Sequence, residues 1–278
     1  MEMGKDRLRL WRDGGVFGKL ELLSARCFRH RYPAHSHDEF VIAAFRRGAQ
    51  RHQIVRHTGI AYAGTVMIIP PGAVHTGEAA ERDGGWEYCA FYPEASVLER
   101  IADEWLGPGT GTLDFGRDVI FEDRVMTGHL LNAHRIAEMS PDPIERQCAL
   151  FDAFGLLIRR YGQRTREPRT SPILDANIAP AIEFLREHFD RPLIVREIAR
   201  VVDFSEFHFM RLFRAKTGLT VHAYLTQLRL QRAKDLLQQG TRPVDIAVDV
   251  GFCDQSHMIK RFRAHFGVTP GDFASACR

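Results

Sequence analysis

A chain of 278 residues, 45% of them hydrophobic and 26% charged, with a net charge of +3, has the size and composition of a globular protein of about two domains. No apolar run is long enough to span a bilayer and residues 1–15 lack the apolar core of a secretion signal, so we expect a cytoplasmic protein with no membrane partner. Five scattered cysteines without paired spacing favour reduced thiols over a disulfide framework.

The first ninety or so residues are predicted to form short β-strands. Alternation of apolar and polar residues indicates strands at Arg7–Trp11, Lys19–Leu23, Phe40–Phe45, Arg51–Val55, Val66–Ile69 and Trp86–Phe91. Turn signals separate them at Asp13-Gly14-Gly15, Arg47-Gly48, Thr58-Gly59, Pro70-Pro71-Gly72 and Asp83-Gly84-Gly85. Several short strands at this spacing predict a sandwich or a small barrel.

Two histidine-containing segments lie within this β region. They read PAHSHDE at residues 33–39 and IPPGAVH at residues 69–75. Together with Gly48 and Gly64-Thr65, they resemble the cupin-type ligand-binding domain, and the resemblance covers roughly the first ninety residues. It implies a barrel whose interior holds a ligand.

The histidines allow three interpretations. His35 and His37 are two residues apart and share one face of a strand, where they could meet Glu39 and His75. In metal-dependent cupin enzymes such a set holds a divalent metal. Here the glutamate follows His37 more closely than the enzyme motif requires, so we expect no metal, no cofactor and no catalytic residue.

The remaining interpretations are a purely structural role at the barrel rim and a small-molecule pocket. A small barrel has room for one small ligand, and aromatic residues would supply an apolar wall with a few polar anchors. We therefore expect an effector-binding set consisting of His35, His37, Glu39, His75, Trp86 and Tyr88.

From residue 95 the apolar period becomes helical. Helices are predicted at Ser96–Leu106, Arg117–Met139 and Pro143–Tyr161. They either close the barrel or form a dimer seam, and an amphipathic stripe alone does not decide between the two. The polar, proline-bearing residues 163–177 then indicate a linker, giving domains at 1–162 and 178–278.

The second domain contains one sequence twice. SEFHFMRLFRAKTGLT at 205–220 aligns without a gap with DQSHMIKRFRAHFGVT at 254–269. Each copy begins with a helix-capping residue, Ser205 or Asp254, and ends at a glycine suited to a left-handed stop, Gly218 or Gly267. Short apolar helices, Val195–Val201 and Val244–Val250, precede the copies, so each unit is a predicted helix-turn-helix.

A continuous helix, Val221–Gln238, is predicted between the two units. At 1.5 Å per residue it spans roughly 27 Å. With the width of each unit added, it can separate two helices that read successive major grooves, which lie about 34 Å apart.

Residues from about 178 to 275 resemble the DNA-binding domain of the AraC/XylS family of bacterial transcription regulators, many of which carry a cupin-type domain. The matching residues are Ile198-Ala199, Ser205, Phe213–Gly218, Tyr224, Arg229, Ala233, Leu236-Leu237, Gly240, Ile246-Ala247, Gly251-Phe252, Gln255-Ser256-His257, Phe262 and Phe266–Pro270. Fifteen lysines and arginines against eleven acidic residues between 178 and 278 also suit a polyanionic partner.

The resemblance implies which side chains meet DNA. They are Phe207, His208, Met210, Arg211 and Arg214 in the first copy, and Gln255, Ser256, His257 and Lys260 in the second. Arg211 has the fork that bonds guanine, unless it contacts phosphate or an internal partner, and Gln255 has the amide that pairs with adenine.

We therefore expect an α+β protein, not an enzyme: a homodimeric transcription regulator that binds double-stranded DNA and a small-molecule effector. The resemblance favours activation, with RNA polymerase as a further partner. Two alternatives remain open, a metal-dependent cupin enzyme fused to a DNA-binding domain and a constitutive DNA-binding protein with no effector.

Overall fold

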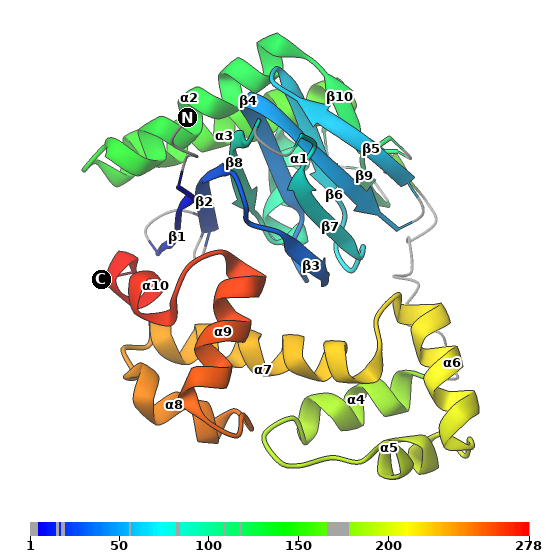
Figure 1. Cartoon of the computed structure of the whole chain (residues 1–278). Coiled ribbons are helices and arrows are strands. Elements are labelled where there is room, and N and C mark those ends of the chain that lie inside the picture. The colour runs from blue at the N-terminus through cyan, green and yellow to red at the C-terminus, as the bar shows by residue number, and fades with distance from the viewer. Residues whose placement is uncertain are drawn as a thin grey trace. The chain divides into compact units, whose positions relative to one another are not determined.

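A computed structural model describes residues 5–14, 17, 20–55, 57–81, 84–107, 109, 111–116, 118–165 and 178–277, apart from the side chain of Phe207. The chain has a strand-rich N-terminal domain with accompanying helices and an all-helical C-terminal domain (Figure 1). Residues 166–177 of the expected linker lie outside the described part. Among the described residues, no helix has both the length and the apolar character needed to cross a membrane.

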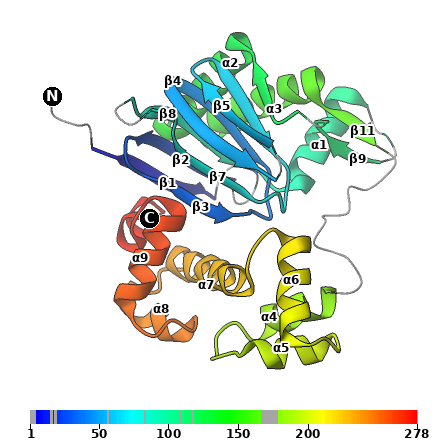
Figure 2. The same ribbon diagram turned by 45° about the vertical axis from the view of Figure 1, so that its right-hand side comes forward.

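The N-terminal domain is built on an antiparallel sheet. Its strand order is β1 (Arg7–Asp13), β2 (Leu20–Cys27), β8 (Trp86–Tyr92), β4 (Val41–Ile54), β6 (Thr65–Ile69) and β10 (Ile120–Glu122). β4 also pairs with β5 (His57–Tyr62) and β7 (His75–Ala79), and β7 pairs with β3 (Tyr32–His35). Because β4 pairs at different points along its length with several strands, the sheet curls on itself, as Figure 2 shows.

Two predicted turns are strand instead. Arg47-Gly48 lies inside the long strand β4, where the register with β8 shifts between Phe45 and Arg47 as a β-bulge. Gly48 has a φ of 68°, and a Cβ there would lie 2.1 Å from the carbonyl oxygen of Gly85. The glycine therefore serves a bulge with a close backbone approach, not a chain reversal. Thr58-Gly59 lies within β5, whose register with β4 is regular through both residues.

Three helices accompany the sheet: α1 (Ala95–Leu106), α2 (Arg124–Met139) and α3 (Pro143–Tyr161). α2 begins seven residues later than predicted, because Ile120–Glu122 pair with β6 and the side chain of Asp123 then caps the helix by accepting from the N–H of Met126. Rings of α2 and α3 pack on Phe91 of β8, with centroids 5.3 Å away for His134 and 5.4 Å away for Phe154. Gln163–Thr165, at the start of the expected linker, form β11, which pairs with β9 (Thr112–Asp114).

The C-terminal domain contains seven described helices. They are α4 (Ala179–Glu187), α5 (Val195–Val201), α6 (Glu206–Thr217), α7 (Val221–Gln238), α8 (Pro243–Asp249), α9 (Gln255–Phe266) and α10 (Pro270–Ala276). α4, α5 and α6 pack at the start of α7, while α8, α9 and α10 pack at its end (Figure 1). The core of the first half includes Phe209 and Phe213, both fully buried, and the core of the second half includes Met258 and Phe262, also fully buried.

The sequence repeat is a structural repeat. Ser205 caps α6 by accepting from the N–H of His208, and Asp254 caps α9 by accepting from the N–H of His257. Gly218 and Gly267 end these helices in the left-handed region, with φ values of 75° and 79°. An apolar residue and a threonine follow each glycine, and the threonines, Thr220 and Thr269, cap α7 and α10. The repeated unit therefore continues into the first turn of the following helix.

Candidate functional site

The outward face of α6 carries most of the side chains predicted for the first copy. His208, Met210, Arg211 and Arg214 are exposed. Phe207 is part of α6, but its side chain lies outside the described part of the structure. The Arg211 guanidinium lies 3.4 Å from Nδ1 of His208, one turn earlier on the same helix. Arg211 therefore points outward beside another polar group.

The outward face of α9 repeats this arrangement with different side chains. Ser256 and Lys260 are exposed, while Gln255 and His257 are half-buried. His257 is held from two sides: Nε2 accepts from Nε of Arg261 at 3.2 Å, and Nδ1 lies 3.3 Å from Sγ of Cys253. His257 is therefore held by neighbours within the unit, whereas Ser256 and Lys260 are exposed and Gln255 is partly exposed.

An acidic side chain lies at the N-terminus of each helix, Glu206 at α6 and Asp254 at α9. At α9, the hydrogen bond from the N–H of His257 and the one from Cys253 hold the pKa of the Asp254 carboxyl below its usual value. The cap is therefore a carboxylate at neutral pH, and its negative charge stabilises the positive N-terminal end of the helix dipole. At α6, Glu206 forms an ion pair with Arg196 of α5 at 2.8 Å, which joins the two helices of the unit.

The two helices lie at opposite ends of α7 (Figures 1 and 2). α7 is an uninterrupted helix of 18 residues, or about 27 Å. The half-buried guanidinium of Arg229, in the middle of α7, donates to the backbone oxygens of Phe189 at 2.7 Å and Arg191 at 3.0 Å. Arg229 thus fixes the segment between α4 and α5 on α7, which keeps the first unit in place.

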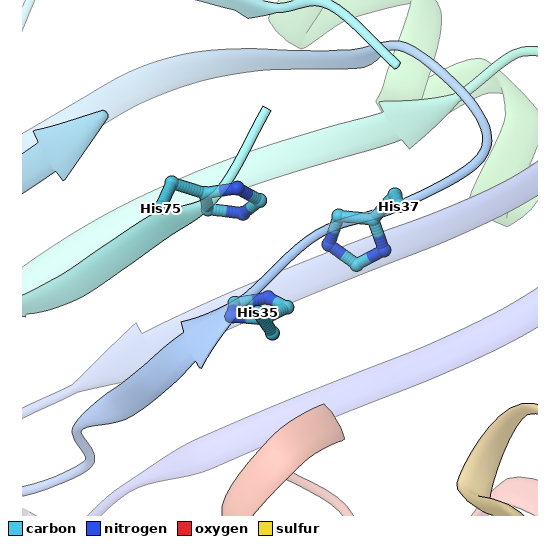
Figure 3. A group of neighbouring side chains, drawn as sticks. All are labelled: His35, His37 and His75. Atoms are coloured by element: carbon cyan, nitrogen blue, oxygen red, sulfur yellow. The ribbon is translucent and has the colours of Figure 1, made fainter. Parts of the chain in front are cut away.

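Three of the residues expected in the N-terminal pocket come together. His35 at the end of β3, His37 just after it and His75 at the start of β7 each offer a ring nitrogen, and these atoms lie within 4.8 Å of one another (Figure 3). Nδ1 of His35 lies 2.7 Å from the carbonyl oxygen of Pro33, so the tautomer that donates there leaves Nε2 unprotonated. Three imidazoles in this arrangement have the donor chemistry of a zinc-type site.

Trp86 and Tyr88 lie together on another part of the same domain. The Tyr88 ring stacks on Phe45 with a centroid distance of 5.5 Å and on Trp86 at 6.5 Å. His37 instead approaches Tyr92, with ring centroids 5.0 Å apart, and burial raises the pKa of the Tyr92 hydroxyl. Glu39 is half-buried and is not one of the residues whose ligand atoms converge with the three histidines.

A cavity of about 290 Å³ lies elsewhere in the N-terminal domain, and none of the six expected residues lines it. Most of its lining is apolar: Phe40, Ile54, Val55, Ile68, Pro70, Ala73, Phe115 and Val119. The acidic lining residues are Asp114 and Asp118, and His57 is also present. The apolar residues come from β4 and β6, from the loops beside these strands and from the segment after β9. No local motif marks them, so sequence patterns could not have identified this cavity.

Comparison with known families divides the chain in the same way. Residues 17–154 match the model of the AraC-like ligand binding domain, and residues 198–276 match that of a helix-turn-helix domain. The chain is 27% identical over 229 residues to the uncharacterized HTH-type transcriptional regulator YbfI of Bacillus subtilis, covering 82% of each chain. It is 36% identical over 97 residues to the regulatory protein SoxS of Salmonella typhimurium, covering 34% of this chain and 91% of SoxS.

The fold is shared with solved structures of much lower sequence identity. An apo form of ToxT from Vibrio cholerae, carrying a single substitution, superposes with a TM-score of 0.57 at 10% identity, covering 99% of this chain and 98% of ToxT. Wild-type ToxT bound to an unsaturated fatty acid gives a TM-score of 0.54 at 12% identity, covering 99% and 96%. The combination of a strand-rich domain with a domain of two helix-turn-helix units is therefore a known architecture.

Proposed function

This chain belongs to the AraC family of transcription regulators, which join an effector-binding domain to a helix-turn-helix DNA-binding domain, and we propose that it reads promoter DNA through the outward faces of α6 and α9. One observation carries the proposal: two copies of the same capped helix, with buried inner faces and exposed outer faces, are held at the ends of one continuous helix. Each copy enters one of two adjacent major grooves.

The exposed side chains divide into two roles. Arg211 donates to O6 and N7 of a guanine, and Gln255 pairs with an adenine, since these are the groups whose geometry fits those bases. Met210, with 39% of its surface exposed, contacts a thymine methyl group. Arg214, Lys260 and Ser256 contact phosphates, which position the protein without reading sequence. His208 supports Arg211, and Phe207 belongs to the same face of the helix.

Selection of DNA sequences bound by the full chain tests these roles. Arg211→Ala and Gln255→Ala should each relax base preference in a different half of the selected site. Arg214→Ala should weaken all sequences alike and reduce the dependence of affinity on salt. Loss of binding without any change of base preference in Arg211→Ala and Gln255→Ala would show that these residues touch only the DNA backbone.

We propose that the effector binds in the N-terminal domain, in the apolar cavity and not beside the three histidines. The ToxT structure with an unsaturated fatty acid illustrates an apolar ligand in this fold. In this chain the acidic lining residues Asp114 and Asp118 disfavour a carboxylate head, so an apolar effector with a neutral or cationic head fits better. Its binding controls DNA binding only if its affinity differs between two arrangements of the protein.

A matched set of ligands tests binding in the apolar cavity. Hexanol and hexylamine should raise the melting temperature more than hexanoate does. Val119→Trp, which fills the cavity, should remove the effect, while Val125→Trp at an exposed position of α2 should not. A stabilisation by hexanoate that equals that of hexylamine would contradict the assignment of the head group.

A metal-dependent enzyme is the second candidate, because the ring nitrogens of His35, His37 and His75 converge within 4.8 Å. Elemental analysis of purified protein separates the two. A regulator without metal should contain no stoichiometric zinc, iron, nickel or manganese, and one equivalent that His75→Ala removes would favour the enzyme. Homodimerisation, activation, contact with RNA polymerase and a cytoplasmic location are parts of the proposal, and light scattering with and without DNA tests the first.

A further inference from the structure

A second pocket in the N-terminal domain lies between the outer face of the sheet and α2, and the proposed function does not use it. Its volume is about 400 Å³. Residues from β1, β2, β4, β8 and α2 line it, and none of them lines the apolar cavity. It therefore constitutes a separate site with its own chemistry.

Four arginines from four different elements line this pocket: Arg7, Arg26, Arg46 and Arg135. Strand register places two of them directly opposite each other, since Arg7 of β1 pairs with Arg26 of β2. Like charges facing each other across strands are destabilising unless an anion lies between them. Such a pair at the edge of a pocket is the arrangement expected where a negatively charged ligand binds.

The two glutamates in the lining do not neutralise all of these arginines. Glu87 is paired with Arg26 at 3.0 Å, and Glu138 is paired at 2.9 Å with Arg9, which is not a lining residue. Arg135 makes a hydrogen bond of 3.0 Å to the neutral amide of Asn132. Within the described part of the chain, no carboxylate forms an ion pair with Arg7, Arg46 or Arg135. The rim is therefore cationic.

The floor of the pocket is polar but uncharged. Cys89 is buried, and burial raises the pKa of its thiol to about 12. His134, with 3% of its surface exposed, is kept neutral because burial lowers its pKa to about 4. A hydrogen bond to the backbone of Leu23 accounts for one ring nitrogen, and Nε2 is buried with no partner among the described residues.

A neutral histidine that donates through Nδ1 presents a lone pair at Nε2. A ligand that completes this site must therefore donate a hydrogen bond to His134 while it offers negative charge to the arginines. An ammonium donor is disfavoured beside a cationic rim, which leaves a hydroxyl group. We propose that this arginine-lined pocket binds a small hydroxy-carboxylate, with its carboxylates on Arg7, Arg46 and Arg135 and its hydroxyl on His134.

Isothermal titration calorimetry of the full chain with matched acids tests the proposal. Citrate and malate carry the hydroxyl, and tricarballylate and succinate are the same acids without it. Citrate should bind at least about tenfold more tightly than tricarballylate, and malate at least about tenfold more tightly than succinate. The reason is that without the hydroxyl Nε2 of His134 stays buried and unpaired. Equal affinity within both pairs, or no saturable binding of citrate and malate at millimolar concentration, would overturn the proposal.

Variants locate the binding. Arg46→Gln and Arg135→Gln remove exposed arginines and should each weaken citrate binding by about tenfold. Arg100→Gln removes an exposed arginine of α1 outside the pocket and should leave it unchanged. Nuclear magnetic resonance of the imidazole nitrogens should show a shift at Nε2 of His134 with malate and not with succinate. Binding unaffected by Arg46→Gln and Arg135→Gln would refute the assignment.

Failure of this site and failure of the proposed function are distinguishable. Val119→Trp should remove stabilisation by hexylamine and leave citrate binding intact, since Val119 does not line the arginine-rich pocket. Citrate binding that Val119→Trp abolishes would contradict a separate site.

Discussion

Replacement of Phe262 by alanine should unfold the second half of the DNA-binding domain. Phe262 is fully buried, and its ring lies 4.6 Å from the ring of Phe266 and 6.1 Å from that of Phe273. Removal of a fully buried phenylalanine costs about 3–5 kcal/mol. Each aromatic pair adds about 0.5–1.5 kcal/mol beyond its buried area, so we expect a value near the upper end of that range.

The distribution of tryptophan makes this loss measurable within one sample. Trp11, Trp86 and Trp105 are all in the N-terminal domain, so tryptophan fluorescence reports its unfolding, while circular dichroism also reports the helices of the C-terminal domain. Phe262→Ala should advance the circular dichroism transition in urea and leave the fluorescence transition near its wild-type midpoint. The exposed change Lys260→Ala is the control. A loss below about 1 kcal/mol in Phe262→Ala would refute the assignment of Phe262 to the core.

Four further outcomes are expected. Ser205→Ala should cost about 1 kcal/mol by removing the cap of α6, measured by urea unfolding. Because the pKa of Asp254 is lowered in the folded state, this residue stabilises the wild type above the usual aspartate pKa, and the stabilisation is lost as pH falls. Asp254→Ala should lack this contribution. Equal acid sensitivity of variant and wild type would contradict this. The wild type should lose stability as pH falls from 6.5 to about 4, because the pKa of His134 is lowered to about 4 in the folded state. His134→Phe should lack this loss, and thermal unfolding at a series of pH values measures it. Gly48→Ala should destabilise the N-terminal domain, since its Cβ would overlap the Gly85 carbonyl; an unchanged fluorescence midpoint would count against the bulge.

The helical domain could be predicted closely from the sequence because its signals are local. The predicted helices Val195–Val201 and Val221–Gln238 have the same bounds in the structure, and Gly240 and Pro243 mark the end of the longer one in the sequence. Gly218 and Gly267 end their helices as expected, since only a left-handed residue stops a helix in this way. Duplication reinforced each assignment, because the same pattern occurred twice.

The strand-rich domain was predicted less completely because its structure depends on partners distant in sequence. β3, β5, β7, β9, β10 and β11 carry no clear alternation of their own, and pairing with other strands defines them. The sequence predicts a turn at Gly48, because a glycine after arginine looks the same in a bulge and in a chain reversal. Only the register with β8 distinguishes the two.

The sites divide in the same way. The exposed faces of α6 and α9 follow from helical periodicity, and the convergence of His35, His37 and His75 follows from a motif. The apolar cavity and the arginine-lined pocket depend on side chains from many segments, such as Phe40 with Phe115 or Arg7 with Arg135. No spacing in the sequence connects these residues.

The most direct test of the account is the dependence of DNA affinity on the spacing between the two halves of the selected site. α7, a continuous helix of 18 residues, connects α6 to the second unit, and the proposal has α6 and α9 read major grooves about 34 Å apart. Insertion of half a helical turn of DNA between the halves should reduce the affinity of the full chain to that of a single half. Affinity that is independent of the inserted length would contradict simultaneous reading by the two helices.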